Sequence, residues 1–284
     1  GKRLFNNIYL CEGETLISKV DAPADGLEKA NLNYVSQLAE KSDIPMYLGL
    51  IPSAAEVWRD KLPEGAESWD QNAYLSQAAG LGLPMIDFSA ALTAHADEPI
   101  FYRTDHHWST MGAYQGYQAL MTSMTGSYTQ LDTQPTLVSD RFYGTTWSSA
   151  GAGWISPDEM YTWVPEGGLT GNTTVTRYPE GLPEEGSLYD LSKLEQKDKY
   201  SMFLGGNQGL CIIENPDAQN GKLLVIRDSY SDSLAPFLSM DYQEVHLFDP
   251  RYNRTPISAY IEDNEIDAVL VLCSAANFST DDNL

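Results

Sequence analysis

Two histidines stand side by side in the segment "YRTDHHWST", and an aspartate directly precedes them. Imidazole takes and returns protons near neutral pH, and a nearby carboxylate can orient one ring. The segment is expected to be a loop that leads into a helix N-terminus, a usual place for functional groups. Asp105, His106 and His107 are therefore the first candidates for chemistry, whereas the other two histidines stand alone.

The second candidate is the serine of "LLVIRDSYSDSLAPFL", where an apolar strand is expected to end at Ile226 and a helix to begin soon after. In open α/β sheets, ligands bind beyond the carboxyl ends of the strands. A turn from strand to helix can project a serine there, with backbone N–H groups facing developing negative charge. Ser229 is thus a candidate nucleophile; the alternative is that Ser229 or Asp228 only caps the helix.

A nucleophilic serine needs a general base, because its hydroxyl barely ionises at neutral pH. A histidine meets this need when an acceptor on its second ring nitrogen fixes the tautomer. Ser229, one histidine of the pair and Asp105 supply these three roles. The hypothesis requires two segments that are far apart in the sequence to meet in space.

Three further residues are candidates. In "FLGGNQG", Asn207 carries a side-chain amide donor in a glycine-rich segment, and the alternative is an ordinary turn. Arg251 and Tyr252 follow a predicted strand and are candidate substrate contacts. Arg251 is expected to hold a substrate carboxylate, to hold Asp228, or to form a structural ion pair.

The elements that would position these residues alternate along the chain. Continuous apolar runs indicate strands covered on both faces, as in a parallel sheet. These runs lie at 44–52, 83–88, 222–229, 244–249 and 267–274. Helical patterns lie at 24–42, from Thr110 to Met124 with Ser109 as N-cap, after 233, and at 257–263. The alternation predicts a doubly wound α/β layer sandwich.

The stretch 137–205 departs from this alternation, because it is rich in Gly, Pro, Trp and Tyr. Its short alternating pieces predict hairpins and loops. We therefore expect a single α/β domain over residues 1–284, in which 137–205 is an inserted segment rich in strands and loops. Its aromatic side chains either stack on sugar rings or form a small local core. They are Tyr143, Trp147, Trp154, Tyr161 and Trp163.

The chain is strongly acidic, with 40 Asp and Glu against 17 Lys and Arg and a formal charge of -23. Nucleic acid and anionic membranes are therefore not expected partners. No apolar run reaches the roughly 18 residues of a membrane helix. The chain also begins without a signal pattern, so we expect it to be part of a longer protein. The three cysteines form no ligand pattern, and a metal on Asp105 and the histidine pair would need a further ligand.

The segments "YRTDHHW" with "GAY" after it, "DSYSDSLAPFL" and "HLFDPRY" together resemble bacterial DHHW-motif proteins. Through them, most of the chain resembles the alginate O-acetyltransferase group of SGNH-hydrolase-like proteins. The resemblance implies an SGNH-hydrolase-like three-layer sandwich with a parallel sheet, in which a permuted order places the aspartate and histidine before the serine. It assigns Asp105 and His107 as the dyad and Ser229 as the nucleophile. His106 then takes the variable position, where it is a candidate substrate contact.

The same resemblance implies an O-acetylesterase or O-acetyltransferase that acts on a cell-surface or extracellular carbohydrate. An acyl donor protein is a further expected partner, and no cofactor or metal is expected. By analogy, Asn207 would polarise the acyl carbonyl together with the Ser229 N–H. The alternative is a non-catalytic surface module that binds glycan on the same fold. This alternative rests on Arg227, which stands where a glycine usually precedes the Asp-Ser pair.

Overall fold

The computed structural model describes residues 3–24 and 26–283, which form a mixed α/β fold around one seven-stranded sheet. In spatial order its strands are β4 (Met46–Ile51), β12 (Ala268–Ser274), β10 (Asn220–Arg227), β11 (Tyr242–Phe248), β9 (Leu210–Glu214), β7 (Thr174–Arg177) and β8 (Glu184–Gly186). Two smaller sheets contain β1 (Leu4–Phe5), β2 (Ile8–Cys11) and β3 (Thr15–Ser18), and β5 (Thr136–Phe142) and β6 (Asp158–Thr162).

The large sheet is mixed, whereas the sequence predicted a parallel one. Strands β4, β12, β10 and β11 are parallel neighbours, but β9 pairs antiparallel with β11. Only residues 215–219 join β9 to β10, and a parallel crossover needs about a dozen residues or more, so the chain reverses direction here. Strands β7 and β8 then extend the antiparallel edge, so the stretch 137–205 contributes two strands to the main sheet.

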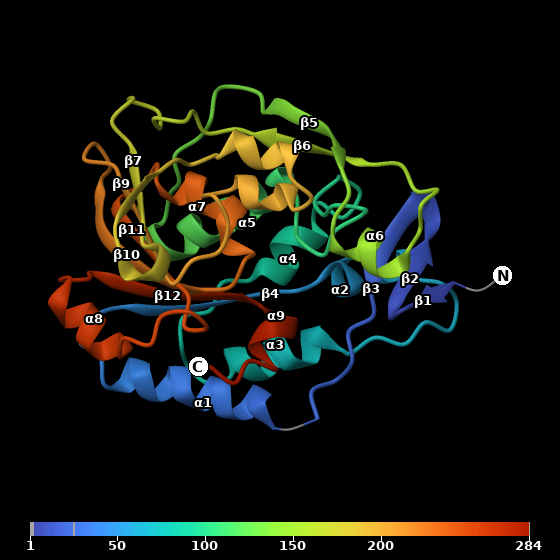
Figure 1. Ribbon diagram of the computed structural model, residues 1–284. Coiled ribbons are helices and arrows are strands. Elements are labelled where there is room, and N and C mark those ends of the chain that lie inside the picture. The colour runs from blue at the N-terminus through green and yellow to red at the C-terminus, as the bar shows by residue number, and fades with distance from the viewer. Residues whose placement is uncertain (1–2, 25, 284) are drawn as a thin grey trace.

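Helices cover both faces of the sheet, as Figure 1 shows. On one side lie α1 (Leu27–Glu40), α3 (Gln71–Ala79), α8 (Ile257–Asp263) and α9 (Ala275–Phe278), and on the other lie α4 (Phe88–Thr93), α5 (Thr110–Thr125) and α7 (Ser231–Leu238). Helices α2 (Ala54–Val57) and α6 (Thr145–Ala150) contact β3. The 3-10 turns are η1 (Glu12–Glu14), η2 (Arg59–Lys61), η3 (Pro179–Gly181), η4 (Leu191–Glu195) and η5 (Lys199–Met202). Among the described residues, no helix has the length and apolar character that a membrane crossing requires.

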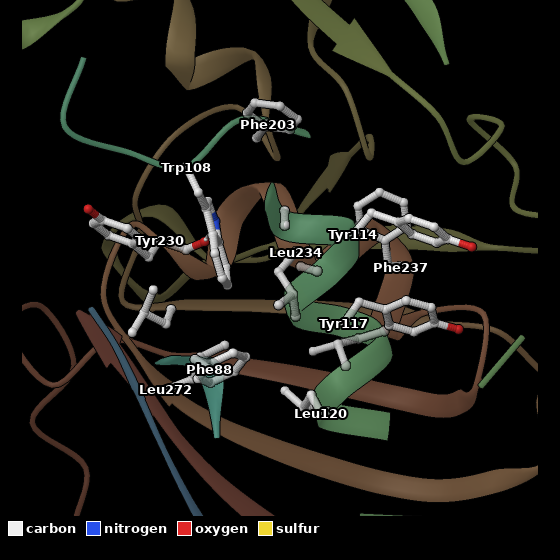
Figure 2. Close-up of a cluster of buried hydrophobic side chains, with 14 of the residues drawn as sticks. Phe88, Trp108, Tyr114, Tyr117, Leu120, Phe203, Tyr230, Leu234, Phe237 and Leu272 are labelled. Atoms are coloured by element: carbon white, nitrogen blue, oxygen red, sulfur yellow. Dashed lines mark hydrogen bonds between the residues drawn. The ribbon is translucent and has the colours of Figure 1, made fainter. Parts of the chain in front are cut away.

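The apolar run of β10 is continuous because both of its faces are buried. Leu223 and Val225 belong to the core under α4, α5 and α7, while Leu224 and Ile226 belong to the core under α1, α3 and α8. Figure 2 shows the first of these cores, in which Phe88 of α4 and Tyr230 lie against the indole of Trp108, while Tyr114, Tyr117 and Phe237 of α5 and α7 pack on one another. The strand that carries Ser229 at its end is thus held rigidly from both sides.

Most of the predicted elements are confirmed, and one is not. Helix α5 begins after Ser109, whose hydroxyl accepts a hydrogen bond from Gly112 N, as expected of an N-cap. The predicted strand at 83–88 is wrong, since only a single bridge joins Met85 to Leu48. The run ends early because Asp87 caps α4, accepting a hydrogen bond from the N–H of Ala90.

Candidate active site

Backbone contacts join the two ends of the loop that carries the two histidines, as in a β-hairpin. Phe101 and Trp108 form an antiparallel bridge, and Tyr102 N donates to His107 O. Trp108 is fully buried, and its indole N–H donates to Tyr230 O at 2.9 Å. This bond joins the loop directly to the turn that follows β10, so the two distant segments are fixed against each other.

The side chains of Asp105, His107 and Ser229 are hydrogen-bonded in series. His107 Nε2 lies 2.8 Å from Ser229 Oγ, and His107 Nδ1 lies 2.6 Å from Asp105 Oδ1. The aspartate and the histidine are buried, while Ser229 is half-buried. A partly accessible hydroxyl therefore contacts a ring nitrogen whose other nitrogen faces a carboxylate, which is the geometry of a serine activated by a general base.

Asp105 is held from several sides. Its Oδ1 also accepts from His107 N at 3.0 Å, and its Oδ2 accepts from Thr145 N and Thr145 Oγ1 at 2.8 and 3.0 Å. Burial raises the pKa of Asp105, but attraction to His107 and these hydrogen bonds outweigh it and hold the pKa well below its usual range. Gly144 leaves the room for this packing, because a Cβ there would lie 2.3 Å from the Asp105 side chain.

The lowered pKa of Asp105 predicts how the stability of the protein depends on pH. A carboxyl whose pKa is depressed on folding stabilises the protein above its unfolded pKa of about 4, and this contribution is lost as the pH falls below that value. We expect the difference in unfolding free energy between wild type and Asp105→Asn to be largest above about pH 5 and to shrink toward pH 3. Urea unfolding at several pH values measures it, with the exposed Asp198→Asn as control. A difference that grew toward pH 3 would contradict this account.

Asp228 organises the turn rather than capping α7 alone. Its Oδ1 accepts from Tyr230 N at 3.0 Å, and its Oδ2 accepts from Ser274 N and Asn277 Nδ2 at 2.9 and 2.8 Å. These bonds connect the carboxyl ends of β10 and β12. The hydroxyl of Ser229 is left for His107, so its alternative role as a helix cap is not observed.

Arg227 stands where the family resemblance led us to expect a glycine, and its side chain lies inside the protein. Its side chain is completely buried, and Nη1 contacts Asp232 Oδ1 and Asn207 Oδ1, both at 2.6 Å. The guanidinium thus fixes the carbonyl end of the Asn207 amide. In the described part of the chain, neither the amide nitrogen of Asn207 nor the N–H of Ser229 has a protein acceptor.

The structure gives Arg251 a structural partner. Its guanidinium forms a two-pronged pair with the buried Asp249, through Nε at 2.9 Å and Nη2 at 2.7 Å. Of the three alternatives for Arg251, the structure shows the structural ion pair, and the hydrogen bonds of the Asp228 carboxylate come from Tyr230, Ser274 and Asn277. Tyr252 is 63% exposed, and its ring lies 5.6 Å from the Arg251 guanidinium. Both residues follow β11 at the same edge of the sheet as Ser229.

His106 lies at the surface of the site. Its ring centroid is 3.9 Å from that of His107, and its Nδ1 is 2.6 Å from Thr145 Oγ1. Burial and His107 lower the pKa of His106, which favours the neutral ring. Asp105, His106 and His107 offer metal-ligand atoms within 4.8 Å of one another, but a metal would have to replace the hydrogen bonds that these atoms already make.

Three contacts of the site were not predicted from the sequence. Thr145 binds Asp105, Tyr230 donates from its hydroxyl to His106 O, and Tyr200 stacks on His107. Two of them come from the stretch 137–205, which carries no motif at these positions. Of the three residues, only Tyr230 could have been placed at the site from the sequence, because it directly follows Ser229 in the strand-to-helix turn.

A cavity of about 300 Å³ opens beside Asp105. Phe142 and Tyr143 give it an apolar wall, Thr145 contributes a hydroxyl, and Lys197 also lines it. Of the five aromatic residues for which sugar stacking and a local core were the alternatives, Trp163 packs against the main core, with its ring centroid 4.4 Å from that of Tyr114. The cavity therefore lies at the carboxylate end of the hydrogen-bonded series.

These observations define an α/β protein that carries a serine, a histidine and an aspartate in hydrogen-bond series at the carboxyl ends of its parallel strands. The sequence model of the family described as "DHHW protein" matches residues 80–248, which include all three residues. The chain belongs to the DHHW family, as its sequence predicted. No match was found among the curated proteins.

Solved structures agree with this assignment. A DHHW family protein from Eubacterium siraeum has a TM-score of 0.82 at 23% identity, and the match covers 98% of this chain and 94% of that one. PatB1 of Bacillus cereus, solved with a sulfonyl adduct, has a TM-score of 0.76 at 22% identity and covers 96% of each chain. The O-acetyltransferase domain of Pseudomonas putida AlgJ has a TM-score of 0.59 at 15% identity, covering 98% and 94%. The TM-scores show that these proteins share the fold of this chain.

Proposed function

We propose that this protein is a serine acyl-transfer enzyme, an O-acetylesterase or O-acetyltransferase, with Ser229, His107 and Asp105 as its catalytic residues. The observation that carries the proposal is the hydrogen-bonded series, with 2.8 Å between serine and histidine and 2.6 Å between histidine and aspartate. We further propose that the sheet and its helical layers correspond to an SGNH-hydrolase-like three-layer sandwich in permuted chain order. The similarity to an O-acetyltransferase domain supports both statements.

In this mechanism Ser229 Oγ attacks the carbonyl carbon of an acetyl ester while His107 Nε2 accepts the hydroxyl proton. Asp105 holds the ring in the required tautomer and stabilises the imidazolium that forms. The tetrahedral intermediate collapses, the leaving alkoxide takes the proton from His107, and the acetyl group remains on Ser229. Water or a sugar hydroxyl then gives its proton to His107 and attacks the acetyl carbon. The bond between this carbon and Ser229 Oγ breaks, and Oγ takes the proton back from His107.

The developing oxyanion needs hydrogen-bond donors that are already in place. The N–H of Ser229 is one such donor, because no protein acceptor in the described part of the chain occupies it. Asn207 is the second, since Arg227 holds its carbonyl oxygen and leaves its amide nitrogen to face the opposite way. Arg227 thereby supports the turn at a position where a glycine is usual.

The substrate in this proposal is an acetylated carbohydrate at the cell surface or outside the cell, and an acyl donor protein is the partner of a transferase. Half-exposed His106 and exposed Tyr252 are the proposed substrate contacts, together with Arg251, which lies beside Tyr252. A carbohydrate suits an exposed aromatic ring next to polar groups, because sugar rings pair apolar faces with hydroxyls. The cavity beside Asp105 gives room for part of the substrate.

A fluorophosphonate probe tests the proposal, because it reacts with activated serines. We expect peptide mass spectrometry to find the adduct on Ser229 in wild type. Labelling should disappear in Ser229→Ala and fall at least about a hundredfold in His107→Ala, because the base is lost. The exposed serine variant Ser76→Ala should label like wild type.

Absence of labelling at Ser229 in folded wild-type protein would overturn the enzymatic proposal. It would favour the non-catalytic glycan-binding module, which would then be tested by binding of acetylated oligosaccharides. If labelling is found, release of acetate from an acetylated oligosaccharide, with and without an acceptor sugar, separates esterase from transferase.

A further inference from the structure

The ring of Tyr200 stacks face to face on the ring of His107, the proposed general base. Its ring centroid is 3.8 Å from that of His107, and the two planes differ by only 6°. Tyr200 is 6% exposed, and its hydroxyl donates to Ser229 O at 2.9 Å and lies 3.2 Å from Ser233 Oγ. One side chain therefore contacts both the ring that accepts the proton and the backbone of the residue that gives it.

A parallel stack stabilises the protonated and the neutral ring of His107 to different extents. The face of an aromatic ring carries partial negative charge, so it attracts a cation more than a neutral ring. Burial raises the pKa of Tyr200 well above its ordinary value, so the phenol stays neutral and its face is what His107 meets. The stack is thus strongest when His107 carries the proton taken from Ser229.

We infer that Tyr200 is a positioning residue that holds the His107 ring in plane and stabilises its protonated form during acyl transfer. The inference deepens the proposed function and depends on it for its catalytic meaning. It adds no step to the reaction, because Tyr200 exchanges no proton. It assigns to the stretch 137–205, through η5, a direct part in the site.

Other ionisable groups also surround His107, and their geometry differs from that of Tyr200. The ring of His106 is tilted by 37° and that of Tyr230 by 51°, so neither stacks in parallel. The charged groups are Asp105, which is hydrogen-bonded to His107, and Asp232, which attracts it electrostatically while paired with Arg227. All of them remain in place when only the ring at position 200 is changed.

The test follows the His107 ring signal by NMR against pH. The chain has only four histidines, so loss of one signal in His107→Ala assigns it. We expect Tyr200→Leu to move the titration midpoint to lower pH by roughly half to one unit, because the protonated ring loses its partner. Tyr200→Phe, which keeps the ring, should leave the midpoint unchanged. The acid limb of the rate of Ser229 labelling should move in the same direction, with a roughly three- to tenfold lower rate.

Two comparisons separate stacking from packing. Tyr189 is a buried residue of the same segment, and its ring packs on Phe203. Tyr189→Leu therefore removes a buried ring but leaves the stack on His107, so the titration midpoint of His107 should not move. Pentafluorophenylalanine at position 200 keeps the shape of phenylalanine but reverses the charge of the ring face, so it should lower the midpoint relative to Tyr200→Phe. Equal midpoints in these two proteins would overturn the inference, as would a shift in Tyr189→Leu as large as in Tyr200→Leu. The NMR readout needs no activity, so it stands apart from failure of Ser229 to label.

Discussion

Asp105→Asn is expected to slow Ser229-dependent acyl transfer about a thousandfold or more while the protein remains folded. In wild type, Asp105 Oδ1 accepts the hydrogen bond from His107 Nδ1, which leaves Nε2 free to accept the serine proton. An amide at position 105 can present its N–H₂ group to Nδ1 instead, which places the ring proton on Nε2. His107 then presents the N–H of Nε2 to Ser229 Oγ, so this nitrogen cannot accept the proton of the serine.

The measurement is the rate of acetate release or of fluorophosphonate labelling, normalised to folded protein by circular dichroism. Asp132→Asn is the matched control, because Asp132 is exposed and lies outside both the cavity and the hydrogen-bonded series. We expect this variant to keep its rate within about twofold, since an exposed charge is well screened. A rate for Asp105→Asn within tenfold of wild type would show that this carboxylate does not set the tautomer of His107.

Gly112→Ala is expected to lower the unfolding free energy by about 3 kcal/mol or more. Replacing a helical glycine with alanine ordinarily favours the helix by up to about 1 kcal/mol, so the sign here is reversed by packing. A Cβ on Gly112 would lie 2.0 Å from the carbonyl oxygen of Ile100 and 3.0 Å from the Cβ of Trp108. Neither atom can give way easily, because Ile100 O accepts from Ser109 N and Trp108 is fully buried.

The effect is measured as a midpoint shift in thermal or urea unfolding, and a fall of roughly 6–12 °C in Tm is expected for a chain of this size. Gly153→Ala is the control, because no atom lies within 4 Å of a Cβ built there. Its stability should stay within about 0.5 kcal/mol of wild type. If Gly112→Ala were as stable as Gly153→Ala, the close contact between α5 and the histidine loop would be wrong.

The sequence predicted the part of the site that depends on local pattern. The apolar run before Ser229 indicated a buried strand and the N-cap at Ser109 indicated a helix. The residue pattern left the choice between the two histidines open, and the family resemblance assigned His107. Strand β10 and helices α1, α5, α7 and α8 formed where periodicity and caps indicated them, because their cores impose the same spacing.

The unpredicted part depends on contacts between distant segments. Nothing in the neighbourhood of Tyr200 or Thr145 along the chain shows that these residues reach His107 and Asp105. The antiparallel edge of the sheet was missed for a similar reason, since β7 and β8 are short and their pairing is set by β9. Arg227 was read as a departure from the family pattern, and only its buried partners explain it.

Thr145 and Tyr200 come from opposite ends of the stretch 137–205; Thr145 binds Asp105, and Tyr200 stacks on His107, to which Asp105 is hydrogen-bonded. The loop around the exposed Leu182, which joins β7 to β8, is therefore the part of the stretch that could be exchanged while both ends and the two strands stay in place. Removing the whole stretch would instead strip the base and its carboxylate of two supports at once. Natural variation in length is accordingly expected to gather between these two anchors.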